Sequence, residues 1–267
     1  TGDYYGAVNA KIQAETIPKV LYPNDEPEAG KELRLKQQYF FVSCSLQDMV
    51  RLHLGTTGGI RDFHHKFVAQ LNDTHPAIAV PELMRLLIDE HYLDWDEAWE
   101  VTRRTFAYTN HTLLPEALET WSAALLERLL PRHMEIIYEI NRRFLDEVRV
   151  RYMGHDGRIS RLSIIDEGRG RRVRMANLAT VGSFAVNGVA AMHSELVKST
   201  ILKDFHELWP DKFNNKTNGV TQRRWLAHCN PGLRDLVNAA IGDEWENDLS
   251  EIEKLRPQAL SDVQARI

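Results

Sequence analysis

The sequence predicts an open, helix-rich α/β fold with a parallel sheet and a ligand site where the strands end. Three polar clusters carry this prediction, because each directly follows an apolar run. They are residues 70–76 (Gln-Leu-Asn-Asp-Thr-His-Pro), 108–112 (Tyr-Thr-Asn-His-Thr) and 215–219 (Asn-Lys-Thr-Asn-Gly). In open α/β sheets, ligands bind beyond the carboxyl ends of the strands. We therefore interpret each cluster as a turn between a strand and a helix, lining one crevice.

The composition of the clusters indicates the class of ligand. They offer amides, a carboxylate, imidazoles and hydroxyls, which together can donate and accept hydrogen bonds, as the hydroxyls of a sugar require. A phosphate site would depend on glycine and lysine instead. The clusters therefore predict a carbohydrate site.

Length and composition narrow the class of protein further. With 267 residues, 43% of them apolar and 27% charged, the chain can form one large domain or two modest ones. The net charge of −5 argues against nucleic acid as a partner. Two cysteines, Cys44 and Cys229, provide no disulfide framework, which favours a reducing cytoplasm. No apolar run reaches membrane-spanning length, and because the chain begins at Thr1 we expect a piece of a longer protein.

Periodicity and turn residues predict the elements of the first half. Residues 4–20 are expected to form a helix, 21–27 an exposed loop with two prolines, 31–54 a long helix and 55–62 a loop. The apolar run 67–71 predicts a buried strand, and Pro81 can begin the next helix because proline fits the first helical turn.

The chain then continues with a helix over 95–103 and a strand over 105–108. Pro115 is expected to begin a helix, and Pro131 divides it from another. Mostly apolar residues recur at helical spacing in that second helix, so we expect this face to pack into the core. These residues are Met134, Ile137, Tyr138, Asn141, Leu145 and Val148.

The later part contains an arginine-rich stretch, residues 151–174, which we interpret as a solvated hairpin rather than an anion-binding ribbon. Residues 184–200 carry apolar residues at helical spacing and predict a helix. The run from Phe213 leads to the turn at Asn218-Gly219. Helical structure is expected from Trp225, interrupted at residues 230–232 (Asn-Pro-Gly), and again from 233 to the end.

Alternatives to a sugar site exist at the same residues. Asp73 and His75, with His111 or Glu116, could ligate a metal, although Asp-x-His alone is a weak signal. Asp73 could equally be a helix N-terminal residue, and His75 and His193 could be hydrogen-bonded core histidines. The sequence has no Gly-x-Ser-x-Gly elbow and no Gly-x-Gly-x-x-Gly or Walker pattern.

The chain resembles the α-glucan phosphorylases, the family of glycogen, maltodextrin and starch phosphorylases, nearly from end to end. The resemblance is carried by residues 20–25 (Val-Leu-Tyr-Pro-Asn-Asp), 30–40, 71–76, 81–85, 105–112, 114–119, 130–133, 185–189, 193–194, 215–219 and 223–225. So many long motifs make the match specific.

The resemblance implies reversible phosphorolysis of α-1,4-glucan ends to glucose 1-phosphate, by a glycosyltransferase of the two-domain GT-B-like, doubly wound Rossmann-like fold. It implies pyridoxal 5′-phosphate as cofactor, glucan and phosphate as substrates, and a homodimer that is allosterically regulated in some members. The cofactor lysine is expected in a C-terminal domain outside this chain. Residues 1–218 then correspond to the later half of the N-terminal domain, and 219–267 to the helical crossover that follows.

Site residues carry over position by position. His111 and Asn218 match residues that hydrogen-bond the 6-hydroxyl of the reacting glucose, and the His111 carbonyl is expected to face positive charge developing at the anomeric carbon. Asp25 matches a gate residue that blocks phosphate entry, in a gate with Asn24 and Tyr22. Sugar-subsite positions match four further residues: Asp73, His75, Thr112 and Glu116.

Two positions depart from the family. Glu26 stands where members usually have asparagine after the gate aspartate, and Gln222 replaces a proline. The first of three hypotheses is a phosphorylase fragment that is inactive alone. The second is a non-catalytic carbohydrate-binding or scaffold module of the same fold. The third is a metal-dependent hydrolase built on Asp73, His75 and His111.

Overall fold

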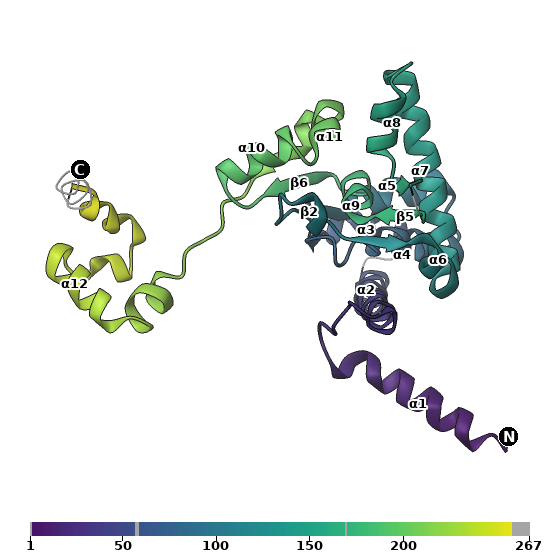
Figure 1. Cartoon of the computed structure of the whole chain (residues 1–267), viewed down its shortest axis with the longest axis horizontal. Coiled ribbons are helices and arrows are strands. Elements are labelled where there is room, and N and C mark those ends of the chain that lie inside the picture. The colour runs from purple at the N-terminus through teal and green to yellow at the C-terminus, as the bar shows by residue number, and fades with distance from the viewer. Residues whose placement is uncertain (1, 57–58, 169, 258–267) are drawn as a thin grey trace. The chain divides into compact units, whose positions relative to one another are not determined.

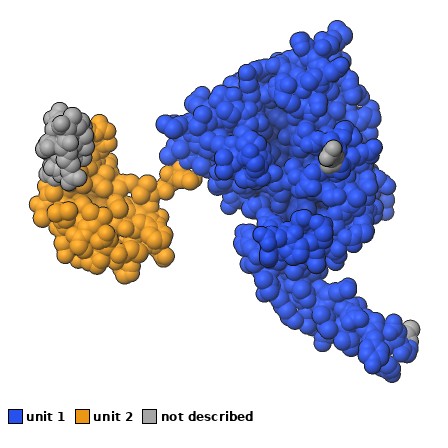
Figure 2. All heavy atoms as spheres, viewed as in Figure 1, with its two compact units in different colours: residues 1–217 blue, residues 218–267 orange. Residues whose placement is uncertain are grey.

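The computed structural model describes residues 2–56, 59–168 and 170–257. The chain divides into two compact units, residues 1–217 and 218–267 (Figure 2). Each unit has an apolar core of its own. The first is built around the strands of a sheet, and the second around Ala227, Val237 and Trp245.

A four-stranded parallel sheet lies within the helices of the first unit (Figure 1). Its strands are β1 (Ala69–Asn72), β2 (Phe106–Thr109), β6 (Ala185–Gly188) and β7 (Phe213–Asn215), in the order β1-β2-β6-β7. One row across the sheet joins Leu71, Tyr108, Val186 and Phe213, all of which are buried. The carboxyl ends of all four strands therefore meet at one edge, because parallel strands run in the same direction.

Helices connect these strands, as parallel neighbours require. Between β1 and β2 lie α4 (Ala79–Arg85), a π-helical turn (Leu86–Glu90) and α5 (Trp95–Thr105). Between β6 and β7 lie α10 (Ala191–Ser199), α11 (Lys203–Leu208) and a 3₁₀ turn (Pro210–Lys212). The long connection from β2 to β6 contains α6 (Ala123–Leu129), α7 (Pro131–Arg151), α8 (Asp156–Leu162) and α9 (Met175–Val181).

A second, antiparallel sheet lies within that long connection. It has the order β3-β5-β4, with β3 at Thr120–Ser122, β5 at Arg172–Arg174 and β4 at Ile165–Asp166. Trp121 pairs with Val173 and both are buried, which ties the arginine-rich stretch to the core. The hairpin predicted over residues 151–174 is present only as β4 and β5, because Arg151 ends α7 and residues 156–162 form α8.

Two long helices precede the sheet. They are α1 (Tyr4–Lys19), which has no buried residue, and α2 (Glu28–Thr56). The Gln37 amide of α2 donates to the carbonyls of Ile17 (2.8 Å) and Val20 (2.5 Å), and so holds the end of α1. Short turns follow at Ile60–Asp62 and Phe63–Lys66. Among the described residues, no helix combines the length and apolarity needed to cross a bilayer.

All the regular secondary structure described in the second unit is helical. It contains a π-helical segment (Arg223–His228), α12 (Pro231–Ile241) and two 3₁₀ segments (Glu244–Glu246 and Leu249–Leu255). Asn230 caps α12 by accepting from the Leu233 N–H over 3.1 Å. The prediction of a break at 230–232 was therefore right, and the same residues also begin the next helix. The end of the predicted helical stretch, 258–267, lies outside the described residues.

The prediction of one helix over residues 184–200 is wrong. Residues 185–188 form β6, and α10 begins only at Ala191. Three successive residues of this short strand, Val186, Asn187 and Gly188, are buried, so both of its faces are covered. A buried parallel strand has no alternating pattern, and its apolar residues therefore also fitted a helical stripe.

Two further expectations need correction. The helix expected from Pro115 is a single 3₁₀ turn (Pro115–Ala117), followed by β3 and only then by α6. The Met175 N–H donates to the Glu119 carbonyl and the Ala123 N–H to the Arg171 carbonyl, which holds this segment extended beside β5. The expected loop at 55–62 is shorter than predicted, because α2 continues to Thr56 and residues 60–62 form a 3₁₀ turn. Positions 57 and 58 lie outside the described residues.

A buried carboxylate joins α2, α4 and α7. Glu82 is fully buried, and it accepts from Ser43 Oγ (2.7 Å), Arg85 Nε (2.8 Å) and His133 Nε2 (2.5 Å). Burial raises the pKa of Glu82, but the hydrogen bonds from Arg85, His133 and Ser43 outweigh it and lower the pKa to about 2. Three helices that support the strand ends are thus fixed by one ionised group.

Candidate functional site

The sheet ends in a row of polar side chains. One position beyond the buried row, the register places Asn72 beside Thr109, Thr109 beside Asn187, and Asn187 beside Asn214. Strand residues alternate between faces, so a single step exchanges an apolar row for a polar one. At the carboxyl edge of the sheet, each of the four strands therefore carries one polar side chain of this row, an amide on three strands and a hydroxyl on β2.

Hydrogen bonds fix these side chains across three strands. Gln70 Nε2 donates to Thr109 Oγ1 (2.8 Å) and lies 3.3 Å from Asn187 Oδ1. Thr109 Oγ1 donates in turn to Asn187 Oδ1 over 2.9 Å. The Asn187 amide nitrogen donates to the Gly188 carbonyl (2.9 Å). The polar row is therefore preorganised, which lowers the entropic cost of binding a ligand.

His111 lies directly after β2 and is exposed. Its Nε2 is 2.8 Å from Asn72 Oδ1 at the end of β1. Because an amide oxygen only accepts, this contact assigns the hydrogen to Nε2 and leaves Nδ1 of the neutral ring as an acceptor. The preceding residue, Asn110, is fully buried, and its N–H donates to the Asn187 carbonyl over 2.9 Å. The loop that carries His111 is thus tied to strands on both sides.

A second histidine lies at the same edge. His193 Nδ1 accepts from the Val189 N–H over 3.1 Å, so its hydrogen lies on Nε2. That Nε2 is buried and has no hydrogen-bond partner among the described residues. Burial, and then the charge of His111, lower the pKa of His193 and favour its neutral form. A neutral imidazole with an unpaired N–H is a hydrogen-bond donor available to a ligand.

Gly188 permits this arrangement. A Cβ on Gly188 would lie 2.5 Å from Ser194 Oγ and 2.7 Å from His193 Nδ1, closer than nonbonded atoms approach. Ser194 Oγ also donates to Asn215 Oδ1 over 2.9 Å, which links α10 to the end of β7. Only glycine at position 188 lets α10 approach the strand ends so closely.

The cluster after β1 adopts a turn rather than a helix start. Asp73 has a φ of 67°, its Oδ1 accepts from the Thr74 N–H (2.6 Å), and its own N–H donates to the Thr109 carbonyl (3.1 Å). Because α4 begins at Ala79, the alternative that Asp73 is a helix N-terminal residue is wrong. Thr74 is buried, whereas Asp73 and His75 are half-buried and remain accessible.

The loop between α1 and α2 lies near His75. Tyr22 and His75 line the same pocket of about 210 Å³. Tyr22 is 77% exposed, with a φ of 54°. Asn24 Oδ1 accepts from the Glu26 N–H (3.1 Å), and Asp25 Oδ2 accepts from Arg34 Nη1 (2.9 Å). The loop is therefore held by its own side chains and by α2.

The remaining predicted residues lie farther along the chain. Thr112 Oγ1 accepts from the Leu114 N–H over 3.2 Å, which shapes the turn after His111. Glu116 is exposed within the 3₁₀ turn Pro115–Ala117. Asn218 is exposed and is the first residue of the second unit. The structure thus brings together His111 and the Asp73 cluster through Asn72 and Thr109, and brings Tyr22 to His75.

The chemistry of this edge is that of hydrogen bonding. Its amides, hydroxyls and imidazoles, with the Asp73 carboxylate, donate and accept, which suits a polyhydroxylated ligand. Within the described ranges, no group of three or more His, Cys, Asp and Glu side chains is placed to hold a metal ion.

Sequence reasoning missed Asn187 and His193 as site residues. Asn187 lies on β6 and His193 on α10, which comes directly after it. Both lie in the stretch 184–200 that was predicted to be a single helix. The signal was present, because Ala185 and Val186 lead directly into Asn187-Gly188, the same turn-forming pair as Asn218-Gly219.

Known proteins resemble the chain along its whole length. The carbohydrate phosphorylase family matches residues 1–266. Glycogen phosphorylase of Synechocystis sp. is 63% identical over 258 residues, which are 97% of this chain and 30% of that protein.

Two mammalian proteins give the same result. The brain form of human glycogen phosphorylase is 53% identical over 98% of this chain and 32% of its own length. The muscle form of Oryctolagus cuniculus is 55% identical over 95% of this chain and 31% of its own length. The chain thus spans about a third of the length of these relatives. By sequence along its length and by its helix-rich α/β structure, the chain belongs to the carbohydrate phosphorylase family.

Proposed function

We propose that this chain is part of an α-1,4-glucan phosphorylase, a glycosyltransferase that cleaves terminal glucose from glycogen or a related glucan with phosphate and releases glucose 1-phosphate. The observation that carries the proposal is the hydrogen-bonded polar edge of the sheet in a member of the carbohydrate phosphorylase family. In this proposal the chain supplies the glucose and acceptor-sugar side of the active site, and it is inactive alone.

His111 has the central role in this proposal. With Nε2–H held by Asn72, Nδ1 can accept a hydrogen bond from the 6-hydroxyl of the reacting glucose. The His111 carbonyl provides a fixed dipole for positive charge that develops at the anomeric carbon, and a preorganised dipole of this kind is a large catalytic term. Asn218 is proposed to bind the same hydroxyl.

The other residues serve the neighbouring sugars and the entry of phosphate. Asp73 and His75, with Thr112 and Glu116, are proposed to line the acceptor subsites. Asp25 is proposed to gate the entry of phosphate, together with the loop residues Tyr22 and Asn24, and Glu26 stands at the position proposed to contact the bound glucose. The Asp25–Arg34 ion pair of 2.9 Å then holds one position of the gate.

Pyridoxal phosphate, the cofactor that the family implies, does not fit the strand-end residues of this chain. An imine requires a shielded lysine, and the cofactor phosphate requires basic partners. Lys216, the lysine beside the strand ends, is exposed and donates to Asn214 Oδ1 over 2.7 Å. We therefore propose that other parts of a longer protein hold the cofactor.

We also propose the setting of the longer protein. In this proposal residues 1–218 are the later half of the N-terminal domain and 219–267 the crossover that follows it, and the division of the chain at residues 217 and 218 supports this. The two free cysteines, Cys44 and Cys229, are both exposed, which suits a reducing cytoplasm. A homodimer is proposed from the family alone.

The test uses the full-length gene product that contains this chain. Phosphate-dependent release of glucose 1-phosphate from maltoheptaose is measured for the native protein, His111→Ala and the control His155→Ala, because His155 is an exposed residue beside α8. We expect a loss of at least a hundredfold in kcat/KM for His111→Ala alone, about 3 kcal/mol. Glucan binding without phosphorolysis by the native protein would replace this proposal with the non-catalytic module.

A further inference from the structure

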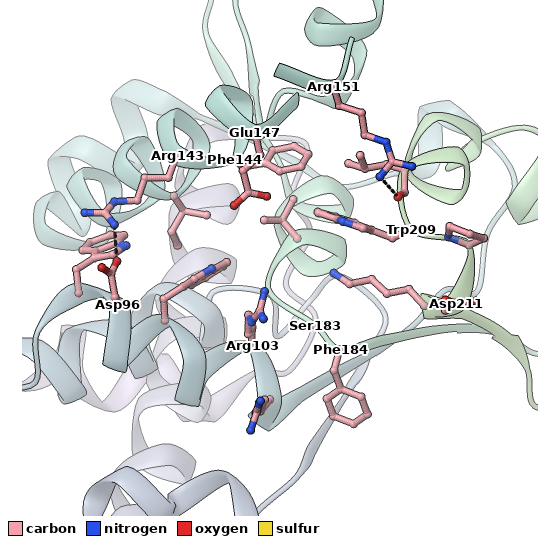
Figure 3. A pocket seen from close by; sticks show the side chains of 18 residues that line it. Asp96, Arg103, Arg143, Phe144, Glu147, Arg151, Ser183, Phe184, Trp209 and Asp211 are labelled. Atoms are coloured by element: carbon pink, nitrogen blue, oxygen red, sulfur yellow. Dashed lines mark hydrogen bonds and ion pairs between the residues drawn. The ribbon is translucent and has the colours of Figure 1, made fainter. Parts of the chain in front are cut away.

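A large cavity lies at the opposite edge of the parallel sheet, away from His111. Its volume is about 780 Å³. Residues that directly precede three strands line it: Arg103 and Arg104 before β2, Ser183 and Phe184 before β6, and Lys212 before β7. Figure 3 shows side chains of α5, α7 and the segment after α11 around this space. The glucan chemistry proposed above does not use these residues.

Lys212 is the unusual group in the cavity. Its ammonium nitrogen lies 3.0 Å from the Thr180 carbonyl and 4.0 Å from the centre of the Trp209 ring. Burial, and then repulsion by Arg103, lower the pKa of Lys212 to about 7, and Glu147 opposes this shift. Among the described residues, no carboxylate forms a hydrogen bond or ion pair with the Lys212 amine. A bound anion would therefore favour the charged form of this amine.

The other charges around the cavity leave this position unneutralised. Arg143 is paired with Asp96 (2.6 Å), and Figure 3 shows the pair at one side of the cavity. Arg103 and Arg104 share a single carboxylate, Glu100, at 2.7 and 2.6 Å.

Arg151 uses its guanidinium for the Leu208 carbonyl (2.9 Å) rather than for a carboxylate. Glu147 and Asp211 are the remaining acidic lining residues, and no ion pair involves either of them among the described residues. Arg103, Arg104, Arg151 and Lys212 are thus four basic groups against three carboxylates, Glu100, Glu147 and Asp211, which leaves one more basic than acidic group at the cavity.

Two further features indicate a ligand. Ser183 is one of the lining residues and is fully buried, and its hydroxyl has no hydrogen-bond partner among the described residues, which is costly unless a ligand or water supplies one. Three indole rings, Trp95, Trp99 and Trp209, also line the cavity and are only half-buried. Flat rings of this kind bind flat apolar groups.

We propose that this cavity binds a small organic anion with a flat apolar body, of the aromatic carboxylate class. The carboxylate lies toward Lys212 and Arg103, the Ser183 hydroxyl supplies a hydrogen bond, and the ring packs against the indoles. The site is separate from the strand-end site and independent of the glucan chemistry.

The proposal has a pH dependence with a definite sign. The free protein holds Lys212 with a pKa of about 7, whereas a bound carboxylate stabilises the protonated amine. Binding therefore takes up a proton near neutral pH, and the affinity falls as pH rises above 7. The other charged groups that line the cavity are Arg103, Arg104, Arg143 and Arg151, with the acidic residues Asp96, Glu147 and Asp211.

The test measures binding of 1-naphthoate to the full-length gene product by isothermal titration calorimetry at pH 6.0 and pH 8.5, with neutral 1-naphthamide as the matched probe. We expect naphthoate to bind roughly ten to thirty times more weakly at pH 8.5, since most of the Lys212 amine is then neutral. Naphthamide should bind more weakly than naphthoate at pH 6.0, with no change between the two pH values.

Variants locate the effect. Lys212→Met should weaken naphthoate binding by roughly tenfold or more at pH 6.0, the loss expected for one charge-assisted hydrogen bond. Lys203→Met is the control, because that side chain is 61% exposed and does not line the cavity. Lys212→Arg should keep the affinity and remove its pH dependence. Ser183→Ala should weaken binding severalfold at both pH values.

Three results would overturn the proposal: no heat of binding at millimolar naphthoate, equal affinity for naphthamide, or an unchanged affinity in Lys212→Met. If Lys212→Met does not fold, the Lys212→Arg and Ser183→Ala results decide the question. Both of these substitutions are conservative and preserve the packing around the cavity. An affinity independent of pH in the native protein would count against the proposal in the same way.

Discussion

His111 and Asn72 stand 39 positions apart in the chain and are joined by a hydrogen bond of 2.8 Å between ring Nε2 and amide Oδ1. The bond connects the ends of β1 and β2, and it selects the tautomer in which Nδ1 can accept. Asn72 is thus a positioning residue for His111, the residue on which the proposed reaction depends most.

Replacing Asn72 with alanine should therefore lower activity without unfolding the protein. Asn72→Ala in the full-length protein is expected to reduce kcat/KM for phosphorolysis by roughly tenfold, the value of one net hydrogen bond of about 1–1.5 kcal/mol. Steady-state kinetics with maltoheptaose measure this, and Asn9→Ala, on the exposed face of α1, is the control. Unchanged kinetics in Asn72→Ala would show that His111 needs no such support.

The buried carboxylate of Glu82 should control acid stability. Its pKa of about 2 lies below the ordinary value of 4.5, so the ionised form stabilises the folded state above pH 4.5. That contribution, roughly 3 kcal/mol, is lost as pH falls from 4.5 toward 2.

Urea unfolding at pH 7 and pH 4 measures the effect of Glu82. Glu82→Gln is expected to lower the free energy of unfolding at pH 7 by about 3–5 kcal/mol, because Arg85 and His133 lose their buried partner. Glu135→Gln, whose side chain is 67% exposed, should change it by less than about 1 kcal/mol. Equal effects of the two substitutions on the free energy of unfolding would contradict the stabilising role assigned to the ionised Glu82 side chain.

Gly188 should tolerate no side chain. Gly188→Ala places a Cβ within 2.5 Å of Ser194 Oγ and 2.8 Å of Ser194 Cα, so α10 must move. We expect a loss of about 1–3 kcal/mol in the free energy of unfolding, measured as a lower Tm. Gly55→Ala is the control, since nothing lies within 4 Å of its Cβ position. A Tm that falls equally in both variants would refute the close-approach argument.

The loop over residues 21–27 should become more mobile when its ion pair is removed. Arg34→Met removes the contact with Asp25 (2.9 Å), and amide exchange in the loop is expected to rise by about two- to fivefold, as suits a half-exposed pair. Hydrogen–deuterium exchange with mass spectrometry measures this. Lys31→Met, on the same helix and paired with Glu28 (2.7 Å), is the matched control. Exchange that stays at the native rate in Arg34→Met would show that other contacts hold the loop.

Local signals were enough to predict much of the fold and part of the site. Helices α5 and α7 and strands β1 and β2 follow from apolar spacing and from the turns that end them, and the polar residues after β1 and β2 were correctly placed at strand ends. Strand β6 was not predicted, because a short strand covered on both faces has no periodic signal of its own. Asn187 and His193 were missed with it.

The sequence by itself determined the family, the helix-rich α/β class and the kind of chemistry at the strand ends, since these depend on which residues stand in which local order. Only the tertiary structure decided which of those residues meet: Asn72 with His111, Gln70 with Thr109 and Asn187, and Lys212 with Trp209. Such partners are fixed by the order of strands in the sheet and by the register between them. Both are properties of long-range packing, which no pattern within a single segment records.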